Sequence, residues 1–123
     1  MDITPIIPGD RKIIDGYGPG LFRISGEVYR SAVWVFPDEV RDWSVTSVDQ
    51  MDADSLSLAG EKQAEVLLLG MGPKMQLVPS AVKQALRAQG VGLEPMDTGA
   101  ACRTYNILMA EGRRVAAALL PIG

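Results

Sequence analysis

Apolar residues are densest in the second half of the chain, where short apolar runs alternate with amphipathic stretches. Residues 65–69 read Glu-Val-Leu-Leu-Leu and are followed by a glycine-rich segment, a pattern typical of a strand buried on both faces that ends in a turn. Helical spacing over 79–89 comes next, and Gly90 stands where a left-handed C-terminal cap is expected. Residues 91–95 then predict a second short strand. The whole stretch therefore predicts a strand, a crossover helix and a parallel strand.

This unit brings the carboxyl ends of its two strands to one edge of a sheet, where ligands bind in open α/β folds. The turn at 96–98 carries an Asp and a Thr that can both cap the helix that follows. An arginine lies five residues into that helix. The predicted cleft comprises Gly70, Met71, Gly72, Pro73, Met96, Asp97, Thr98 and Arg103.

The pair Gly70-x-Gly72 has two open interpretations. It follows a strand, as in dinucleotide-binding folds, but Met75 occupies the place of the third glycine and the helix does not begin at the turn. A P-loop is excluded because Lys74 is not followed by a hydroxyl residue and the spacer is missing. The pair is then either a tight turn that needs glycine geometry or a nest of backbone amides for a small anion.

The other candidates also have structural interpretations. Asp97 and Thr98 favour an N-terminal helix cap, worth about 1 kcal/mol, and an anion could share the free amides. Arg103 either reaches the cleft or pairs with Glu94 or Asp97, and a structural ion pair is favoured. Cys102 lies beside two alanines, which indicates core packing rather than a reactive thiol.

The rest of the chain predicts antiparallel strands before this unit, and a helix and a strand after it. Proline-rich residues 1–10 predict an extended segment. Strand patterns occur at 12–15, 21–24, 28–36 and 40–48, with turns at 16–20 and 25–27. An acidic connection at 49–60 predicts one helical turn near Ser55, and a helix at 98–110 leads into a buried strand at 114–120. The direction of this last strand stays open. The chain is thus one α/β domain, 1–123, with a hairpin-rich front.

Composition removes several classes of chemistry. The chain has no histidine and one cysteine, which excludes histidine triads, zinc-protease motifs, multi-cysteine metal sites and an internal disulfide. No cofactor or metal is expected. The longest apolar run is far below the ~20 residues that cross a bilayer, and the first residues resemble no signal or transit peptide. We therefore expect a cytoplasmic protein without a membrane span.

Charge is unevenly divided along the chain. Residues 1–61 carry five basic and eleven acidic side chains, a sum of −6, whereas residues 62–123 carry seven basic and four acidic, a sum of +3. This division indicates either ordinary solvated surface or an acidic face for a basic partner beside an anion-friendly cleft. Nucleic-acid binding is disfavoured because the basic residues are dispersed and no aromatic residues interleave with them.

Several motifs resemble a known family of small domains. They lie at 26–29, 37–43, 69–73, 94–98, 101–108 and 111–119, and the Thr-Tyr-Asn-x-Leu run at 104–108 is the most specific. The chain is similar to the family that includes mitochondrial complex I assembly factor 3 and the adipogenesis-associated domain protein of animals. The resemblance implies a three-layer α/β domain with a mixed central sheet, helices against one face and a hairpin layer toward the other. The absence of a presequence indicates a bacterial member.

The same resemblance implies a function in assembly. Mitochondrial members help to build respiratory complex I with a second assembly factor, and bacterial relatives are often encoded beside components of the Sec translocon. We therefore expect a non-enzymatic factor whose partners are other proteins, either assembly factors or subunits of membrane complexes. The alternative is a protein or enzyme that binds a small anion or metabolite in the Gly70/Asp97 cleft, with a carboxylate as base.

Overall fold

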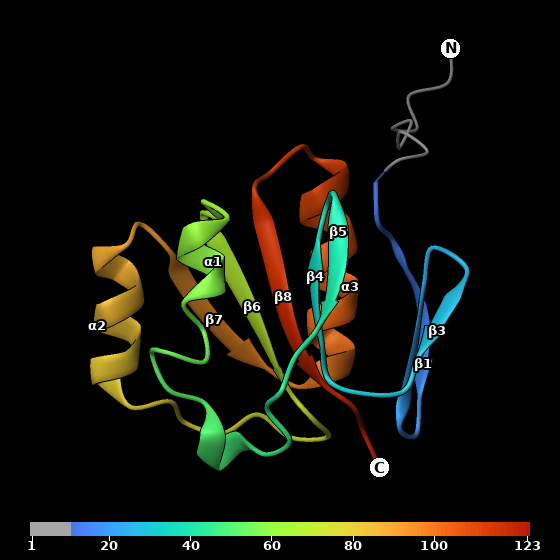
Figure 1. Ribbon diagram of the computed structural model, residues 1–123, viewed down its shortest axis with the longest axis horizontal. Helices are drawn as coiled ribbons and strands as arrows, with labels where there is room; N and C mark the ends of the chain where they lie inside the picture. The colour runs from blue at the N-terminus through green and yellow to red at the C-terminus, as the bar shows by residue number, and fades with distance from the viewer. Residues whose placement is uncertain (1–10) are drawn as a thin grey trace.

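The computed structural model describes residues 11–123, which form two sheets and three α-helices (Figure 1). The segment 1–10, predicted to be extended, lies outside the described residues. In chain order the elements are β1 (Ile14–Gly18), β2 (Leu21–Ile24), β3 (Glu27–Tyr29), β4 (Val33–Phe36), β5 (Glu39–Asp42), the 3₁₀ helix η1 (Val48–Gln50), α1 (Leu58–Glu61), β6 (Val66–Met71), α2 (Ser80–Ala88), β7 (Gly92–Met96), α3 (Thr98–Ala110) and β8 (Val115–Leu120).

The central sheet has five strands in the order β5-β4-β8-β6-β7. Strands β8, β6 and β7 are parallel neighbours, which confirms the predicted parallel pair of β6 and β7 and shows that the last strand runs parallel beside β6. Strand β4 pairs antiparallel with β8, and β5 pairs antiparallel with β4, so the sheet is mixed. A second antiparallel sheet of β1, β2 and β3 forms the predicted hairpin layer.

Side chains of the central sheet alternate between two hydrophobic cores. On β8, residues 115, 117 and 119 face one core, and residues 116, 118 and 120 face the other. The first core includes α3 and the three-stranded sheet, and the second includes α1 and α2. Helices therefore cover both faces, which differs from the expected placement on one face only (Figure 1). The reason is that β8 is apolar on both sides and needs cover on each.

The expected strand 28–36 is two strands in two different sheets. Strand β3 pairs with β2 at the open end of the hairpin layer, where Val28 is 45% exposed, whereas all four residues of β4 are buried in the central sheet. Both pieces have β-forming residues, so the pattern does not reveal the crossing between sheets at 30–32. The first strand also differs, since β1 extends through Gly16 and Gly18 and the turn is confined to Pro19 and Gly20.

The segment predicted as a strand at 40–48 contributes only β5, which ends at Asp42. Trp43 leaves the sheet and packs into the core against Trp34, with ring centroids 5.7 Å apart. Its indole Nε1 donates a hydrogen bond to the Ser55 carbonyl at 3.1 Å and so anchors the acidic connection. The predicted helical turn near Ser55 is a run of turns at 53–57 that leads into α1.

Candidate functional site

The predicted cleft lies at the carboxyl edge of the central sheet. Strands β6 and β7 run in parallel register, with Gly70 opposite Met96, so their two loops open side by side as predicted. Strand β6 continues through Gly70 and Met71, and the turn begins only at Gly72, whose φ is +84°. The edge is therefore assembled as expected, with a shorter turn than the glycine spacing predicts.

A buried threonine joins three chain segments at this edge. The Thr98 hydroxyl donates to the Leu120 carbonyl at 2.6 Å and accepts from the Gly72 amide at 2.8 Å. The Thr98 amide in turn donates to the Gly72 carbonyl at 2.8 Å. The side chain is fully buried, so the ends of β6 and β8 and the start of α3 are tied together inside the protein. An anion that used the Gly72 amide would have to replace this hydroxyl.

The two glycines have separate structural roles. A Cβ atom at Gly70 would lie 2.8 Å from Leu119 Cδ2 and 3.1 Å from Thr98 Oγ1, so the close approach of α3 excludes a side chain there. Gly72 is needed for its positive φ, which other residues rarely adopt. These observations favour the tight-turn interpretation. Anion binding by the amides of this turn stays a prediction.

The remaining predicted residues lie around the start of α3. Asp97 caps the helix, because its Oδ1 accepts a hydrogen bond from the Ala100 amide at 2.9 Å. Met96 is half-buried against the α3 core, and Pro73 is exposed. The ion pair expected for Arg103 is wrong: in the described part of the chain it pairs with neither Glu94 nor Asp97.

Arg103 instead faces the hairpin layer. Its Nη1 donates to the Tyr17 hydroxyl at 3.4 Å. The reason is the close packing of α3 on β1, since a Cβ at Gly99 would clash with that same hydroxyl. The side chain therefore links two layers of the fold rather than reaching the loops at the sheet edge.

The Thr-Tyr-Asn run attaches α3 to β1. The Tyr105 hydroxyl donates to the Lys12 carbonyl at 2.9 Å. The side-chain Nδ2 of Asn106 donates to the Ile14 carbonyl at 2.8 Å, and its Oδ1 accepts from the Ile14 amide at 2.9 Å. The side chain thus makes the pair of hydrogen bonds that the backbone of a neighbouring strand would make. Cys102 is buried in the same core, and burial raises the pKa of its thiol to about 12, which confirms a packing role.

Sequence reasoning missed two exposed apolar side chains beside this edge. Met75 and Leu77 lie in the loop between β6 and α2 and are 47% and 91% exposed. The available signal was the alternation Met-Gln-Leu between Pro73 and Pro79, where no helix or strand could bury it. Leu77 exposes a larger fraction than any other large apolar side chain of the described chain.

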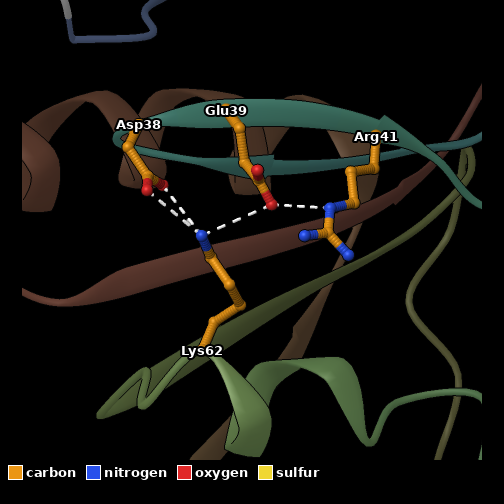
Figure 2. Close-up of polar contacts among 4 residues, drawn as sticks. All are labelled: Asp38, Glu39, Arg41 and Lys62. Atoms are coloured by element: carbon orange, nitrogen blue, oxygen red, sulfur yellow. Dashed lines mark hydrogen bonds and ion pairs between the residues drawn. The ribbon is translucent and has the colours of Figure 1, made fainter.

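Two carboxylates of the acidic first half of the chain, Asp38 and Glu39, pair with cations (Figure 2). Lys62 Nζ lies 3.1 Å from Asp38 and 3.3 Å from Glu39, and Arg41 Nε lies 2.6 Å from Glu39. Burial lowers the pKa of Lys62, but the hydrogen bonds to Asp38 and the negative charges of Asp38 and Glu39 outweigh it and raise the pKa overall. The hairpin β4–β5 is thus linked to α1 by a mixed-charge network.

The described residues do not meet what a metal site or a membrane-spanning helix requires. Between residues 11 and 123, no group of three or more cysteine or acidic side chains is placed to hold a metal ion. Helices in that range are all too short or too polar to span a bilayer.

The chain matches known proteins over nearly its whole length. Residues 14–120 match the family described as protein of unknown function (DUF498/DUF598). An uncharacterized protein of Rhodobacter capsulatus is 46% identical over 109 residues, covering 89% of this chain and 84% of that protein. NADH dehydrogenase (ubiquinone) 1 alpha subcomplex assembly factor 3 of Danio rerio is 37% identical over 111 residues, covering 89% of this chain and 64% of that protein.

A solved structure has the same fold. It is the solution NMR structure of a Bordetella pertussis protein described as a Mth938-like domain. The TM-score is 0.83 with 33% sequence identity, and the match covers 98% of this chain and 92% of that one. The mixed sheet and the hairpin layer are therefore features that the chain shares with solved relatives.

Proposed function

The chain belongs to the DUF498/DUF598 family, and we propose that it is a non-enzymatic assembly factor that acts in the cytoplasm by binding other proteins. The observation that carries this proposal is its 37% identity to an animal protein named as a complex I assembly factor. The chain spans less than two thirds of that protein, so the partners are part of the proposal. We infer that they are assembly factors or subunits of a membrane complex, with respiratory complex I as the first candidate.

The use of polar groups at the predicted cleft supports a non-enzymatic role. The side chains of Thr98 and Asp97 both form hydrogen bonds with backbone groups of the protein. Cys102 is buried with a raised thiol pKa, and the chain has no histidine to act as a base. Residues that would carry turnover at this edge are thus engaged in holding the structure.

We assign the contact with the partner to the loop between β6 and α2. Leu77 is 91% exposed, and fully burying a leucine side chain contributes about 1.5–3 kcal/mol. The occupant would be an apolar patch on the partner protein. Met75 two residues away would enlarge the same contact.

A complementation experiment tests this function. The host is a bacterium that assembles respiratory complex I and from which its own family member has been deleted. Wild type should restore NADH:ubiquinone oxidoreductase activity in membranes and the size of the complex on native gels. Leu77→Asp should fail, whereas Ile107→Asp should succeed, because Ile107 is an exposed apolar residue on α3, at 59% exposure, outside the assigned contact. Failure of wild type itself would contradict the link to complex I.

A second candidate function is small-anion binding at the carboxyl edge, favoured by the two loops that open side by side at the start of α3. Thermal shift against phosphates, nucleotides and organic acids tests it. Saturable stabilisation of the wild-type chain by one of these anions, together with failure to recover any partner by pull-down, would replace the assembly proposal. A pull-down with a charge-reversed variant of Asp38, Glu39 and Asp42 tests the acidic face in the same way.

A further inference from the structure

A cleft of about 290 Å³ opens at the amino edge of the central sheet, opposite the edge just described. Its apolar lining includes Phe36, Ala64 and Val115, which are all buried. The elements that meet here are the end of β4, the segment after α1, and the starts of β6 and β8. The cleft is at the lower end of the size of small-ligand sites, roughly 300–1,000 Å³.

The cleft gathers positive charge in an acidic protein. The chain carries a net charge of −3, yet four of its twelve basic side chains line this one cleft, with Asp38 as the acidic lining residue. These four come from three distant parts of the sequence: Arg11, Lys62, Arg113 and Arg114. A charge concentration of this kind attracts anions, and the buried apolar wall strengthens the interaction by excluding water.

Two of the four cations are already paired. Lys62 is held by Asp38 and Glu39, and Arg113 Nε lies 2.7 Å from Glu65 Oε1. These pairs neutralise much of the charge on one side of the cleft. They also anchor the side chains, so the two pairs contribute more to the shape of the cleft than to free positive charge.

The other two cations have no carboxylate partner within residues 11–123. Arg114 Nε donates to the Gln63 carbonyl at 3.0 Å, which orients its guanidinium group and uses one of its five N–H donors. Arg11 is exposed, and the neighbouring Lys12 amide donates to the Pro37 carbonyl at 2.9 Å, which holds this part of the backbone beside the cleft. Among residues 11–123, the guanidinium groups of Arg11 and Arg114 therefore remain to bind an anion.

We propose that this cleft is a carboxylate-binding site. Arg11 and Arg114 bind the carboxylate, since the planar guanidinium matches its two oxygens, and the apolar wall receives the carbon chain behind it. An organic carboxylate fits better than inorganic phosphate, because its carbon chain can lie against the apolar wall of Phe36, Ala64 and Val115. The carboxylate belongs either to a small free acid or to a Glu or Asp side chain of a bound protein.

The first test uses amide NMR of the full chain with four probes: glutarate, two capped peptides and inorganic phosphate. Glutarate should cause saturable shifts at Ala64, Gly112 and Val115 in the millimolar range. A capped Leu-Glu-Leu peptide that also shifts these amides, while its Leu-Gln-Leu counterpart does not, assigns the carboxylate to a protein side chain. Shifts with glutarate alone assign it to a free acid. No saturable shift with glutarate or the Leu-Glu-Leu peptide, or tighter binding of inorganic phosphate at the same amides, would overturn the proposal.

Three variants locate the binding groups. Arg11→Gln should weaken the affinity for the probe that binds by about tenfold or more, because a hydrogen bond between charged groups is lost. Arg114→Lys keeps the positive charge but loses the planar guanidinium with its parallel N–H donors. It should therefore weaken binding less than Arg11→Gln does. Arg23→Gln removes an exposed arginine of β2 outside the cleft and should leave binding unchanged. Equal loss in Arg23→Gln and Arg11→Gln would show a general charge effect and overturn the site.

Discussion

The two edges of the central sheet use their polar groups in opposite ways. At the carboxyl edge, the Thr98 hydroxyl, the Gly72 amide and the Asp97 carboxylate all bond within the protein. At the amino edge, four cations line an open cleft, and two of them have no carboxylate partner in the described chain. At the carboxyl ends of these parallel strands the polar groups are hydrogen-bonded within the protein, whereas the amino ends border an open polar cleft.

This difference shows that, at the place where ligands commonly bind in such a fold, polar groups can already be hydrogen-bonded within the protein. The carboxyl edge is where open α/β sheets commonly bind ligands, and the loops of β6 and β7 do meet there. In this chain, however, a buried side chain fills that position. We therefore expect substitutions at the carboxyl edge to change stability, and substitutions at the amino edge to change binding.

The largest effect should follow Thr98→Val, which keeps the shape and removes the hydroxyl. The Gly72 amide and the Leu120 carbonyl would both lose this partner in a buried setting. We expect the free energy of unfolding to fall by about 2–6 kcal/mol, since each of the two orphaned groups costs about 1–3 kcal/mol. Urea unfolding measures it, with Thr98→Ser as the control that keeps both bonds. If the urea midpoint of Thr98→Val equals that of wild type, the Thr98 hydroxyl does not stabilise this edge of the sheet.

Gly70→Ala should have the next largest effect. Its new methyl would lie 3.2 Å from Thr98 Cα as well as close to Leu119, so backbone would have to shift. The expected loss is about 1–3 kcal/mol in chemical denaturation, the usual cost of overpacking. Gly92→Ala in the adjacent strand is the matched control, because its nearest neighbour would be an ordinary 3.5 Å contact. Similar losses of stability in both variants would show that the close approach of α3 to Gly70 does not cause the effect.

Asp97→Ala should cost about 1 kcal/mol, the typical value of an N-terminal cap. Asp97→Asn should stay close to wild type, because an asparagine side-chain oxygen accepts the same hydrogen bond from the Ala100 amide. Thermal melts of the two variants measure the difference. A large loss in Asp97→Asn would mean that the negative charge itself is needed, which a simple cap does not require.

The smallest effect on stability should come from Arg113→Gln at the amino edge. The hydrogen bond from Arg113 lowers the pKa of Glu65, so the pair contributes at pH above the unfolded-state pKa of Glu65. That contribution disappears as pH falls through the lower pKa of the folded protein. We expect the pKa of Glu65 to rise in the variant, measured by carboxyl NMR titration, with little change in melting at neutral pH. An unchanged Glu65 titration would show that the pair does not persist in solution.

The fold was predictable where one pattern had one structural solution. Strands β6, β7 and β8 and helices α2 and α3 were recognised because apolar runs and helical spacing alternate with clear caps and turns. The crossover unit then required the loops after β6 and β7 to share an edge. Prediction was weaker before residue 62, since strand-forming residues do not tell which of two sheets they join.

The chain by itself determined the parallel unit, the absence of histidine chemistry, and the place where a ligand would bind in such a unit. Only the tertiary structure decided that Thr98 closes this place and that Arg11, Lys62, Arg113 and Arg114 meet at the opposite edge. The physical reason is that alternation and capping act between near neighbours in sequence. Hydrogen bonds such as Thr98 to Leu120, and the meeting of distant cations, depend on how whole layers pack.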